Sequence, residues 1–254
     1  PAPLHPELIY GGKITRFDRR TAEVTDVSPK PLRKGGYRVI RTQPIVFSPV
    51  DPHVLFFASN TVWKTTNGGQ SWTAISPDLT RKTWDVPANV GKYTGTAQVK
   101  VTQRGVVYAL APSPLDINRM WAGTDDGLLH VTTDGGVTWK NITPPQLVPW
   151  AKVSIIEASH FDPGTAYVAA DHHQDGDYSA YFFKTTDFGK TWTKIGLSVP
   201  VYTTGWSHVV REDPTVQSTP YAGPGPGLLA SWDGGRPRTP LRKGTPPVRP
   251  APAP

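Results

Sequence analysis

The sequence contains no cysteine and only one methionine among its 254 residues. The lack of cysteine excludes disulfides, thiolate metal sites and a cysteine nucleophile. No apolar run approaches the roughly 18 residues that a membrane-spanning helix requires, and no helical periodicity is sustained along the chain. No charged-then-apolar leader follows Pro1, so we expect the chain to start after processing or within a longer protein.

Turn-forming and aromatic residues are abundant instead. The 28 prolines and 24 glycines make up about a fifth of the chain, and these residues break helices and favour short strands joined by turns. Nine Trp, nine Tyr and eight Phe supply enough bulky core material to exclude a fully disordered chain. Together these features predict an all-β protein.

Basic charge is concentrated at one end of the chain. The formal net charge is +7, and the segment 236–254 holds five basic residues, no acidic residue and seven prolines. We expect this segment to be an extended or disordered tail, either a solvated linker or a basic arm that contacts an anionic surface. Residues 1–235 are then nearly neutral. This argues against nucleic-acid binding, which needs basic residues gathered on one folded face.

An octet of similar residues occurs three times. The copies read TTNGGQSW at 65–72, TTDGGVTW at 132–139 and TTDFGKTW at 185–192, and a fourth copy begins at Ser231 and then loses the pattern. Short apolar runs flank each octet, and a marker rich in Asp and Pro comes before it. This arrangement gives four strands per repeat, and four-stranded antiparallel repeats of this length are the blades of β-propellers.

The repeats do not add up to a closed ring. Residues 8–29 read as three strands without an octet, three complete blades follow, and the last repeat gives one strand near 208–211 before its pattern ends. The sequence therefore predicts about four to five blades within 1–235, with incomplete first and last blades. Because open strand edges invite pairing, we expect the chain to be part of a larger propeller, completed by further blades or by a second chain.

The octet resembles the Asp-box, S/T-x-D-x-G-x-T/S-W, of BNR-repeat proteins. This motif marks sialidases, xyloglucan-cleaving endoglucanases, sortilin-type receptor domains, and secreted bacterial proteins known as sortilin-like or BNR-repeat glycosyl hydrolases. Residues 63–80 and 121–128 are most similar to the last group, and the resemblance extends from residue 8 to about 235. It implies a secreted or periplasmic, carbohydrate-active protein that is similar to glycosyl hydrolases. The alternative is a non-catalytic sortilin-type propeller that binds a protein or peptide, because both kinds of protein share the motif.

The octet residues are expected to have structural roles. The Asx side chain folds onto turn amides, the glycine adopts a positive φ, and the tryptophan covers the turn and the blade edge. These residues are Asn67, Gly69, Trp72, Asp134, Gly136, Trp139, Asp187, Gly189 and Trp192. Catalysis by the aspartates is disfavoured because they lie on separate blades, whereas catalytic groups converge on one pocket.

Ligand-binding residues are expected at the opposite end of the blades from the octets. If the strands of a blade are labelled a to d in chain order, the d-to-a and b-to-c connections share that end. Aromatic and cationic side chains in these connections suit sugar stacking or a protein partner, with packing between blades as the alternative role of the tryptophans. The candidates are Trp84, Tyr93, Arg104, Trp150, Lys152 and Trp206.

One carboxylate and one polar loop are further candidates. Glu157 lies in an apparent innermost strand, 153–160, where it would face the central channel as a catalytic group or form a salt bridge. Glycoside hydrolysis needs two carboxylates roughly 5–10 Å apart, and the sequence assigns no second one. The loop residues Asp171, His172, His173, Asp175 and Asp177 are a candidate cation site, with a solvated loop as the alternative. No other cofactor is expected.

Overall fold

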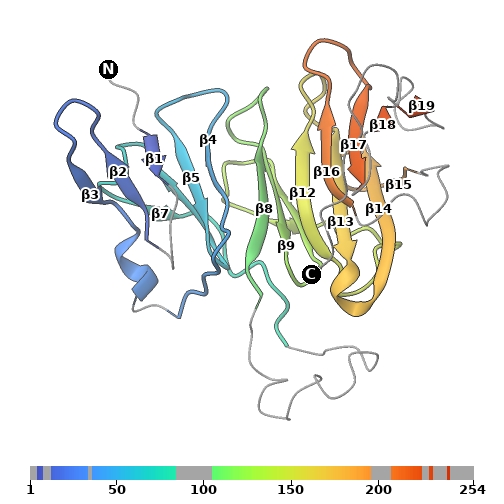
Figure 1. Ribbon diagram of the computed structural model, residues 1–254, viewed down its shortest axis with the longest axis horizontal. Helices are drawn as coiled ribbons and strands as arrows, with labels where there is room; N and C mark the ends of the chain where they lie inside the picture. Colours follow the sequence, from blue (N-terminus) through green and yellow to red (C-terminus); the bar gives the residue numbers. More distant parts are fainter. Residues whose placement is uncertain are drawn as a thin grey trace, which may run out of the picture.

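The computed structural model describes residues 5–7, 13–33, 36–83, 105–195, 207–224, 229–230 and 239–240. These residues form one three-stranded and four four-stranded antiparallel sheets, which lie side by side across the molecule in chain order (Figure 1). Within each sheet the strands are also neighbours in chain order. The described part of the chain has no α-helix, and its only helical segments are the 3₁₀ turns Lys30–Arg33 and His173–Asp175. The all-β, four-stranded blade architecture is therefore confirmed.

We number the sheets as blades 1 to 5. Blade 1 has β1 (His5–Glu7), β2 (Thr15–Phe17) and β3 (Val24–Asp26), and blade 2 has β4 (Ile45–Phe47), β5 (Leu55–Ala58), β6 (Val62–Thr65) and β7 (Thr73–Ala74). Blade 3 has β8 (Val107–Pro112), β9 (Met120–Thr124), β10 (Leu129–Thr132) and β11 (Lys140–Asn141). Blade 4 has β12 (Lys152–Ala158), β13 (Ala166–His172), β14 (Asp177–Thr185) and β15 (Thr193–Lys194). Blade 5 has β16 (Ser207–Glu212), β17 (Pro220–Pro224), β18 (Leu229–Ala230) and β19 (Thr239–Pro240).

The first and last blades differ from the prediction in detail. Blade 1 has the expected three strands, but its first strand is β1, and residues 8–12 lie outside the described residues. The expectation that blade 5 stops after one strand is wrong, because β17, β18 and β19 complete its sheet. β19 lies inside the segment 236–254, which was expected to be a tail, and it pairs with β18. Proline is excluded from central strands but tolerated at an edge, and β19 is the edge strand of its sheet.

The hydrophobic core lies between successive blades rather than within one blade. Phe57 and Trp63 of blade 2 pack against Ile14 and Val27 of blade 1. Equivalent clusters join blades 2 and 3, blades 3 and 4, and blades 4 and 5. Blades 2 to 4 therefore bury both faces against their neighbours, which is why the runs in β5, β9 and β13 are buried throughout.

The three octets form the connections from β6 to β7, β10 to β11 and β14 to β15, and they share one hydrogen-bond pattern. In the blade 3 copy, the Thr132 hydroxyl accepts the Gly136 N–H at 2.9 Å and donates to Asp134 Oδ1 at 2.8 Å. Asp134 also accepts the amide of Thr138 at 2.9 Å and its hydroxyl at 2.5 Å. These bonds, led by the Thr138 hydroxyl, lower the pKa of Asp134 to about 2. The Asp134 carboxylate is thus engaged in hydrogen bonds within its own turn.

Each octet also ties its blade to the preceding one. The indole N–H groups of Trp72, Trp139 and Trp192 donate to the carbonyls of residues 27, 75 and 142, each at 2.7 Å. Gly136 has a φ of +98°, and a Cβ at this position would lie 2.5 Å from the Ile75 carbonyl oxygen. The tryptophan therefore links two blades, in addition to the expected cover over its own turn.

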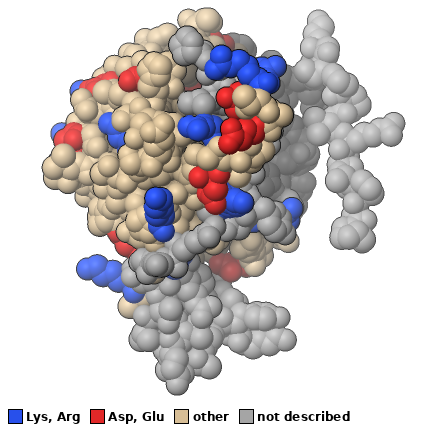
Figure 2. Space-filling view, turned by 90° about the vertical axis from the view of Figure 1, so that its left-hand side faces the viewer, with Lys and Arg blue, Asp and Glu red and all other residues tan. Residues whose placement is uncertain are grey.

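Charges on the visible face of the molecule are mixed. In Figure 2, basic and acidic side chains alternate over the described surface rather than gather in one area of a single sign. This distribution agrees with the near-neutral balance of residues 1–235. No helix among the described residues is long and apolar enough to cross a membrane.

Candidate functional site

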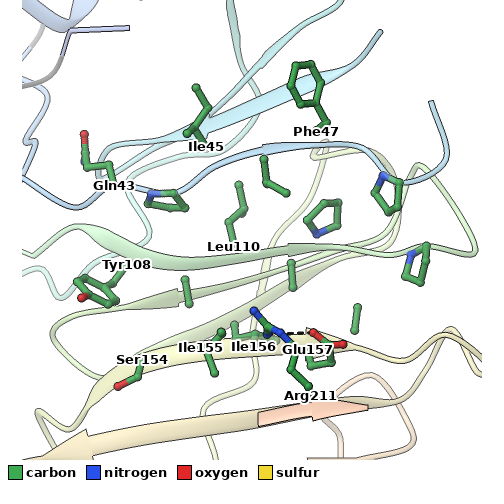
Figure 3. A pocket seen from close by; sticks show the side chains of 18 of the residues that line it. Gln43, Ile45, Phe47, Tyr108, Leu110, Ser154, Ile155, Ile156, Glu157 and Arg211 are labelled. Atoms are coloured by element: carbon green, nitrogen blue, oxygen red, sulfur yellow. Dashed lines mark hydrogen bonds and ion pairs between the residues drawn. The ribbon is translucent and has the colours of Figure 1, made fainter. Parts of the chain in front are cut away.

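The first strands of blades 2 to 5 border one groove. The groove has a volume of about 560 Å³ and is lined from β4, β8, β12 and the Arg211 side chain of β16. Figure 3 shows these strands side by side, with Gln43, Tyr108 and Ser154 at one end of the groove. Ile45, Leu110 and Ile155 form the apolar middle of its wall. The groove is therefore the described part of the central channel.

Three lining residues occupy equivalent positions on successive blades. Each first strand ends at a turn in which a backbone N–H donates to the carbonyl six residues later, at 2.8–3.0 Å. The donors of these bonds are Ser48, Ser113, Ser159 and Asp213. Counting back five residues from each donor gives Gln43, Tyr108, Ser154 and position 208. We call these four positions the entrance ring.

Local backbone irregularity explains why two of these side chains, Tyr108 and Ser154, reach the groove. The register between first and second strands shifts between Val107 and Ala109, between Val153 and Ile155, and between Ser207 and Val209. Positions 108, 154 and 208 are therefore the extra residues of three equivalent β-bulges. A bulge leaves one residue outside the ladder and changes the direction of its side chain, here toward the groove for Tyr108 and Ser154.

Two entrance-ring side chains have buried polar atoms without a hydrogen-bond partner among the described residues. Gln43 is 8% exposed, and neither its Nε2 nor its Oε1 is bonded. The Ser154 hydroxyl is likewise unpaired. An unpaired buried polar group costs about 1–3 kcal/mol, so such groups call for a partner that is bound from outside. The Tyr108 ring lies beside them, with the Lys152 ammonium 5.0 Å from its centroid.

Glu157 lies further along the groove in an ion-paired cluster. Its Oε2 is 3.1 Å from Arg211 Nη1, and its Oε1 is 3.3 Å from His160 Nε2. Glu157 is the only carboxylate among the groove-lining residues that the structure describes. Glu157 therefore lines the channel, as the sequence suggested. It forms a salt bridge with Arg211, which was the expected alternative to a catalytic role. The described groove does not contain the carboxylate pair that glycoside hydrolysis requires.

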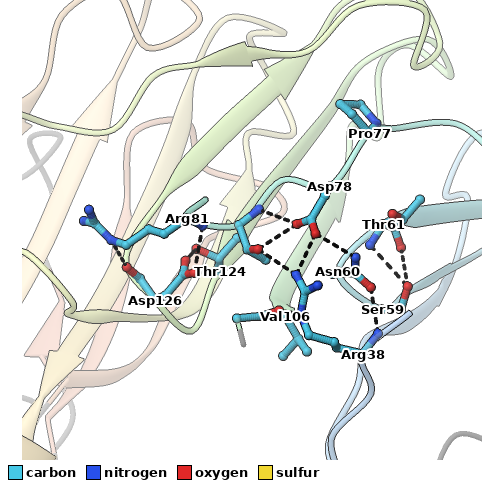
Figure 4. Close-up of polar contacts among 12 residues, drawn as sticks. Arg38, Ser59, Asn60, Thr61, Pro77, Asp78, Arg81, Val106, Thr124 and Asp126 are labelled. Carbon is cyan, nitrogen blue, oxygen red and sulfur yellow. Dashed lines mark hydrogen bonds and ion pairs between the residues drawn. The ribbon is translucent and has the colours of Figure 1, made fainter. Parts of the chain in front are cut away.

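A polar network fixes the loops that connect blades 2 and 3 (Figure 4). Arg38 donates to Asp78 at 2.7 Å and to the Gly105 carbonyl at 2.9 Å. Asp126 is 1% exposed and accepts the Thr124 hydroxyl at 2.5 Å and the Arg81 backbone N–H at 2.9 Å. Burial raises the pKa of Asp126.

The neighbouring Asp125 is held by the same loop. Its Oδ1 accepts the Val106 N–H at 2.8 Å. Burial, followed by the nearby Asp126 carboxylate, raises the pKa of Asp125 to about 6. Residues 125–127 form a tight turn between β9 and β10, and its first residue, Asp125, is a carboxyl group with a pKa above the usual range.

Two of the six predicted binding residues are described, and they lie in different surroundings. Lys152 forms an ion pair with Asp171 at 3.1 Å besides its contact with Tyr108. Trp150 borders a second cavity, where Arg81 lies 4.9 Å from its ring centroid. Trp84, Tyr93, Arg104 and Trp206 lie outside the described residues. Their proposed role on one binding face remains a prediction.

The candidate cation loop is internally paired. His173 Nδ1 bonds Asp171, His172 Nε2 lies 2.5 Å from Asp175 Oδ2, and Asp177 accepts the Tyr181 hydroxyl at 2.5 Å. Among the described residues, no group of three or more His, Asp or Glu side chains is arranged to hold a metal ion. The five residues are close in sequence, but their donor atoms face partners rather than one common point.

Sequence reasoning missed the entrance ring and a buried histidine, His130, which lines the second cavity. The ring residues share no residue type, so no motif marks them. These positions do, however, lie at a fixed distance before the Asp/Pro-rich markers. An alignment of the markers therefore also aligns positions 43, 108, 154 and 208.

Comparison with known proteins supports the fold. No protein-family model and no curated protein sequence matches the chain. The GH74 xyloglucanase from Xanthomonas campestris is similar in structure, with a TM-score of 0.59 and 20% identity over 94% of this chain and 35% of that enzyme. An ancestral GH74 enzyme gives a TM-score of 0.55 and 19% identity over 80% of this chain and 25% of its own length. The chain therefore has a β-propeller fold and spans about a quarter to a third of these enzymes.

Proposed function

We propose that the chain is part of a carbohydrate-binding propeller and that the groove holds the sugar at its entrance ring. The observation that carries the proposal is the unpaired Gln43 amide, which is 8% exposed and lines the groove. An amide offers a donor and an acceptor on one rigid plane, which matches the adjacent hydroxyls of a sugar ring.

The neighbouring groups support the same ligand class. Ser154 adds a hydroxyl that can donate and accept, and Tyr108 adds an aromatic ring with a polar tip. The groove wall between them and Glu157 is apolar, which suits the C–H faces of sugar rings. Small-ligand sites combine such apolar walls with a few polar groups that fix orientation.

Binding rather than hydrolysis is the activity that we assign to these residues. Glu157 is engaged by Arg211 and His160, and hydrolysis by paired carboxylates would need a second acid from outside the described groove. Similarity to glycosyl hydrolases concerns the fold, and fold does not fix activity. We further propose a secreted or periplasmic location, which fractionation of the producing cells would test.

Calorimetric titration of the 254-residue chain with xyloglucan oligosaccharides and a panel of neutral glucans tests the proposal. Xyloglucan is included because one of the structurally similar proteins is a xyloglucanase. We expect Gln43→Ala to weaken glycan binding about tenfold, because the loss of its hydrogen bonds costs about 1.4 kcal/mol. Ser154→Ala should have a smaller effect in the same direction.

The matched control is Gln70→Ala, which removes an exposed glutamine from an octet turn. This variant should bind like the wild type. Absence of binding to every glycan, or equal affinities of Gln43→Ala and Gln70→Ala, would refute the proposal. Release of reducing ends by the wild type but not by Glu157→Gln would show that the groove also hydrolyses its ligand.

A protein or peptide ligand is the second candidate function. Phe47 is 37% exposed at the other end of the groove, where Pro49, Pro112 and Pro114 also line it. Such an apolar, proline-edged surface also fits an extended peptide. Binding of a peptide library that Phe47→Ser abolishes and Gln43→Ala leaves unchanged would favour this candidate.

A further inference from the structure

A second cavity lies away from the groove and shares no lining residue with it. Its volume is about 390 Å³, within the usual size range of small-ligand sites. The segment 78–83, which follows β7, forms one side of the cavity. The outer strands β10 and β11 of blade 3 and the ring of Trp150 complete it.

His130 on β10 is the buried polar group of this cavity. Its strand neighbours Leu129 and Val131 pack in the core toward blade 4, and side chains alternate along a strand, so His130 faces the other way, toward 78–83. The residue is 8% exposed, and its Nδ1 has no hydrogen-bond partner among the described residues. Burial lowers the pKa of His130 to about 4. The neutral ring therefore offers one donor and one acceptor nitrogen at neutral pH.

Trp150 is held against the cavity by a strained backbone. Its φ is +70°, a conformation that costs an aromatic residue free energy and is found mainly where function requires it. The tight turn at Gly127 packs on this backbone, since a Cβ at Gly127 would lie 3.1 Å from the Trp150 nitrogen. With the Arg81 guanidinium 4.9 Å from its centroid, the ring is fixed as a wall of the cavity.

The cavity also has an excess of positive charge and of hydrogen-bond donors. Asp78 is neutralised by Arg38 at 2.7 Å, whereas exposed Lys82 has no carboxylate partner among the described residues. The Asn141 Oδ1 accepts the Thr143 N–H at 3.0 Å and its hydroxyl at 2.8 Å. The Asn141 NH₂ group is therefore the part left to face a ligand.

We propose that this cavity binds a sugar ring that carries a carboxylate, such as a uronic acid residue. Lys82, with Arg81 beside it, receives the carboxylate. The Trp150 ring contacts the apolar face of the sugar, and His130 and Asn141 bond its hydroxyls. The proposal does not rest on a sugar in the groove, because the two sites share no residue.

Titration of the 254-residue chain with trigalacturonic acid, and separately with the neutral trisaccharide maltotriose, tests this assignment. We expect the acidic sugar to bind at least fivefold more tightly, and its affinity to fall with added salt because the charged contact is exposed. Lys82→Gln should weaken acidic-sugar binding about fivefold to tenfold, and Trp150→Asn about tenfold. Asparagine is chosen because it tolerates positive φ.

Controls separate this cavity from the groove and from general charge effects. Lys140→Gln removes the same charge from the strand position next to Asn141 without lining the cavity, and should leave affinity unchanged. Gln43→Ala should also leave acidic-sugar binding unchanged. His130→Leu should weaken it, and wild-type His130 ring nitrogens should shift in ¹⁵N spectra on titration.

Three results would overturn the proposal. The first is no binding of trigalacturonic acid at about 10 mM, far weaker than a specific site would give. The second is loss of its binding in Gln43→Ala but not in Lys82→Gln, which would place the ligand in the groove. The third is equal affinity for acetate, which would show that a free carboxylate suffices and that the ring is not recognised.

Discussion

The two ends of the blades differ in how many of their polar side chains have hydrogen-bond partners. At the octet end, three turns repeat the same bonds, and each Asx side chain and each indole N–H is satisfied. At the other end, the equivalent positions of the entrance ring hold Gln43, Tyr108 and Ser154, and two of these side chains lack a partner among the described residues. The repeated end holds the blades together, whereas the varied end is the one at which we propose that a ligand binds.

Removal of an inter-blade tryptophan should give the largest effect on stability. Trp139→Ala loses the ring that packs between blades 2 and 3 and the bond to the Ile75 carbonyl. We expect the free energy of unfolding to fall by about 3–5 kcal/mol, measured by urea denaturation. Trp139→Phe keeps most of the packing and should lose only about 1 kcal/mol.

Ligand affinity of the folded Trp139→Ala protein should match the wild type, because the octet lies at the far end of the blade from the entrance ring. A melting temperature equal to that of the wild type would contradict the structural role of the octet. A specific loss of glycan affinity in the folded variant would contradict the division between the two ends.

A change of pH should have opposite effects through the buried His130 and the partly buried Asp125. The pKa of His130 is about 4 in the folded protein against about 6.5 when unfolded. Only the unfolded chain gains the proton as the pH falls from about 6.5 to 4, so stability is lost over this window. Asp125 has a pKa of about 6, so its contribution to stability is present below about pH 4 and is lost as the pH rises to 6. Each effect is about 3 kcal/mol.

Unfolding free energies of variants at pH 4, 5, 6 and 7 should reveal these opposite slopes. Relative to the wild type, His130→Leu should gain stability as the pH falls from 6.5 to 4. Asp125→Asn keeps the acceptor for the Val106 N–H and should gain stability as the pH rises from 4 to 6. Parallel pH profiles of all three proteins would mean that neither group is buried as described.

The entrance ring should tolerate an apolar replacement that the octet does not. Gln43→Leu removes an unpaired buried amide and should raise the free energy of unfolding by about 1 kcal/mol, at the expense of glycan binding. Asn67→Leu removes the acceptor of the Ser71 amide bond at 3.0 Å and should lower it by about 1–2 kcal/mol. Chemical denaturation of the two variants gives the comparison directly. Destabilisation by both changes would show that Gln43 is a structural residue.

The sequence allowed prediction of the octet end because its interactions are local. Thr132, Asp134, Gly136 and Thr138 lie within seven consecutive residues, and their bonds depend on turn chemistry. The entrance ring depends instead on bulges between strands and on side chains from different blades. The Glu157 partner Arg211 is 54 residues away in the chain, and no spacing rule connects them. The four-stranded blades and their approximate number followed from the repeat, whereas the groove required the register between strands.

The smallest expected effect concerns the C-terminal segment, where the sequence prediction needs revision. Deletion of 236–254 removes β19, whose residues Thr239 and Pro240 pair with β18 at the edge of blade 5. A two-residue edge strand contributes little, so we expect a loss of about 1 kcal/mol. Deletion of 241–254 spares β19 and removes three basic residues, and we expect it to change stability by less than about 0.5 kcal/mol. Thermal melts of both truncations and the full chain provide the test. If the longer deletion is no more destabilising than the shorter one, β19 does not stabilise blade 5; if both are strongly destabilising, the whole segment packs on the propeller, and it is not a tail.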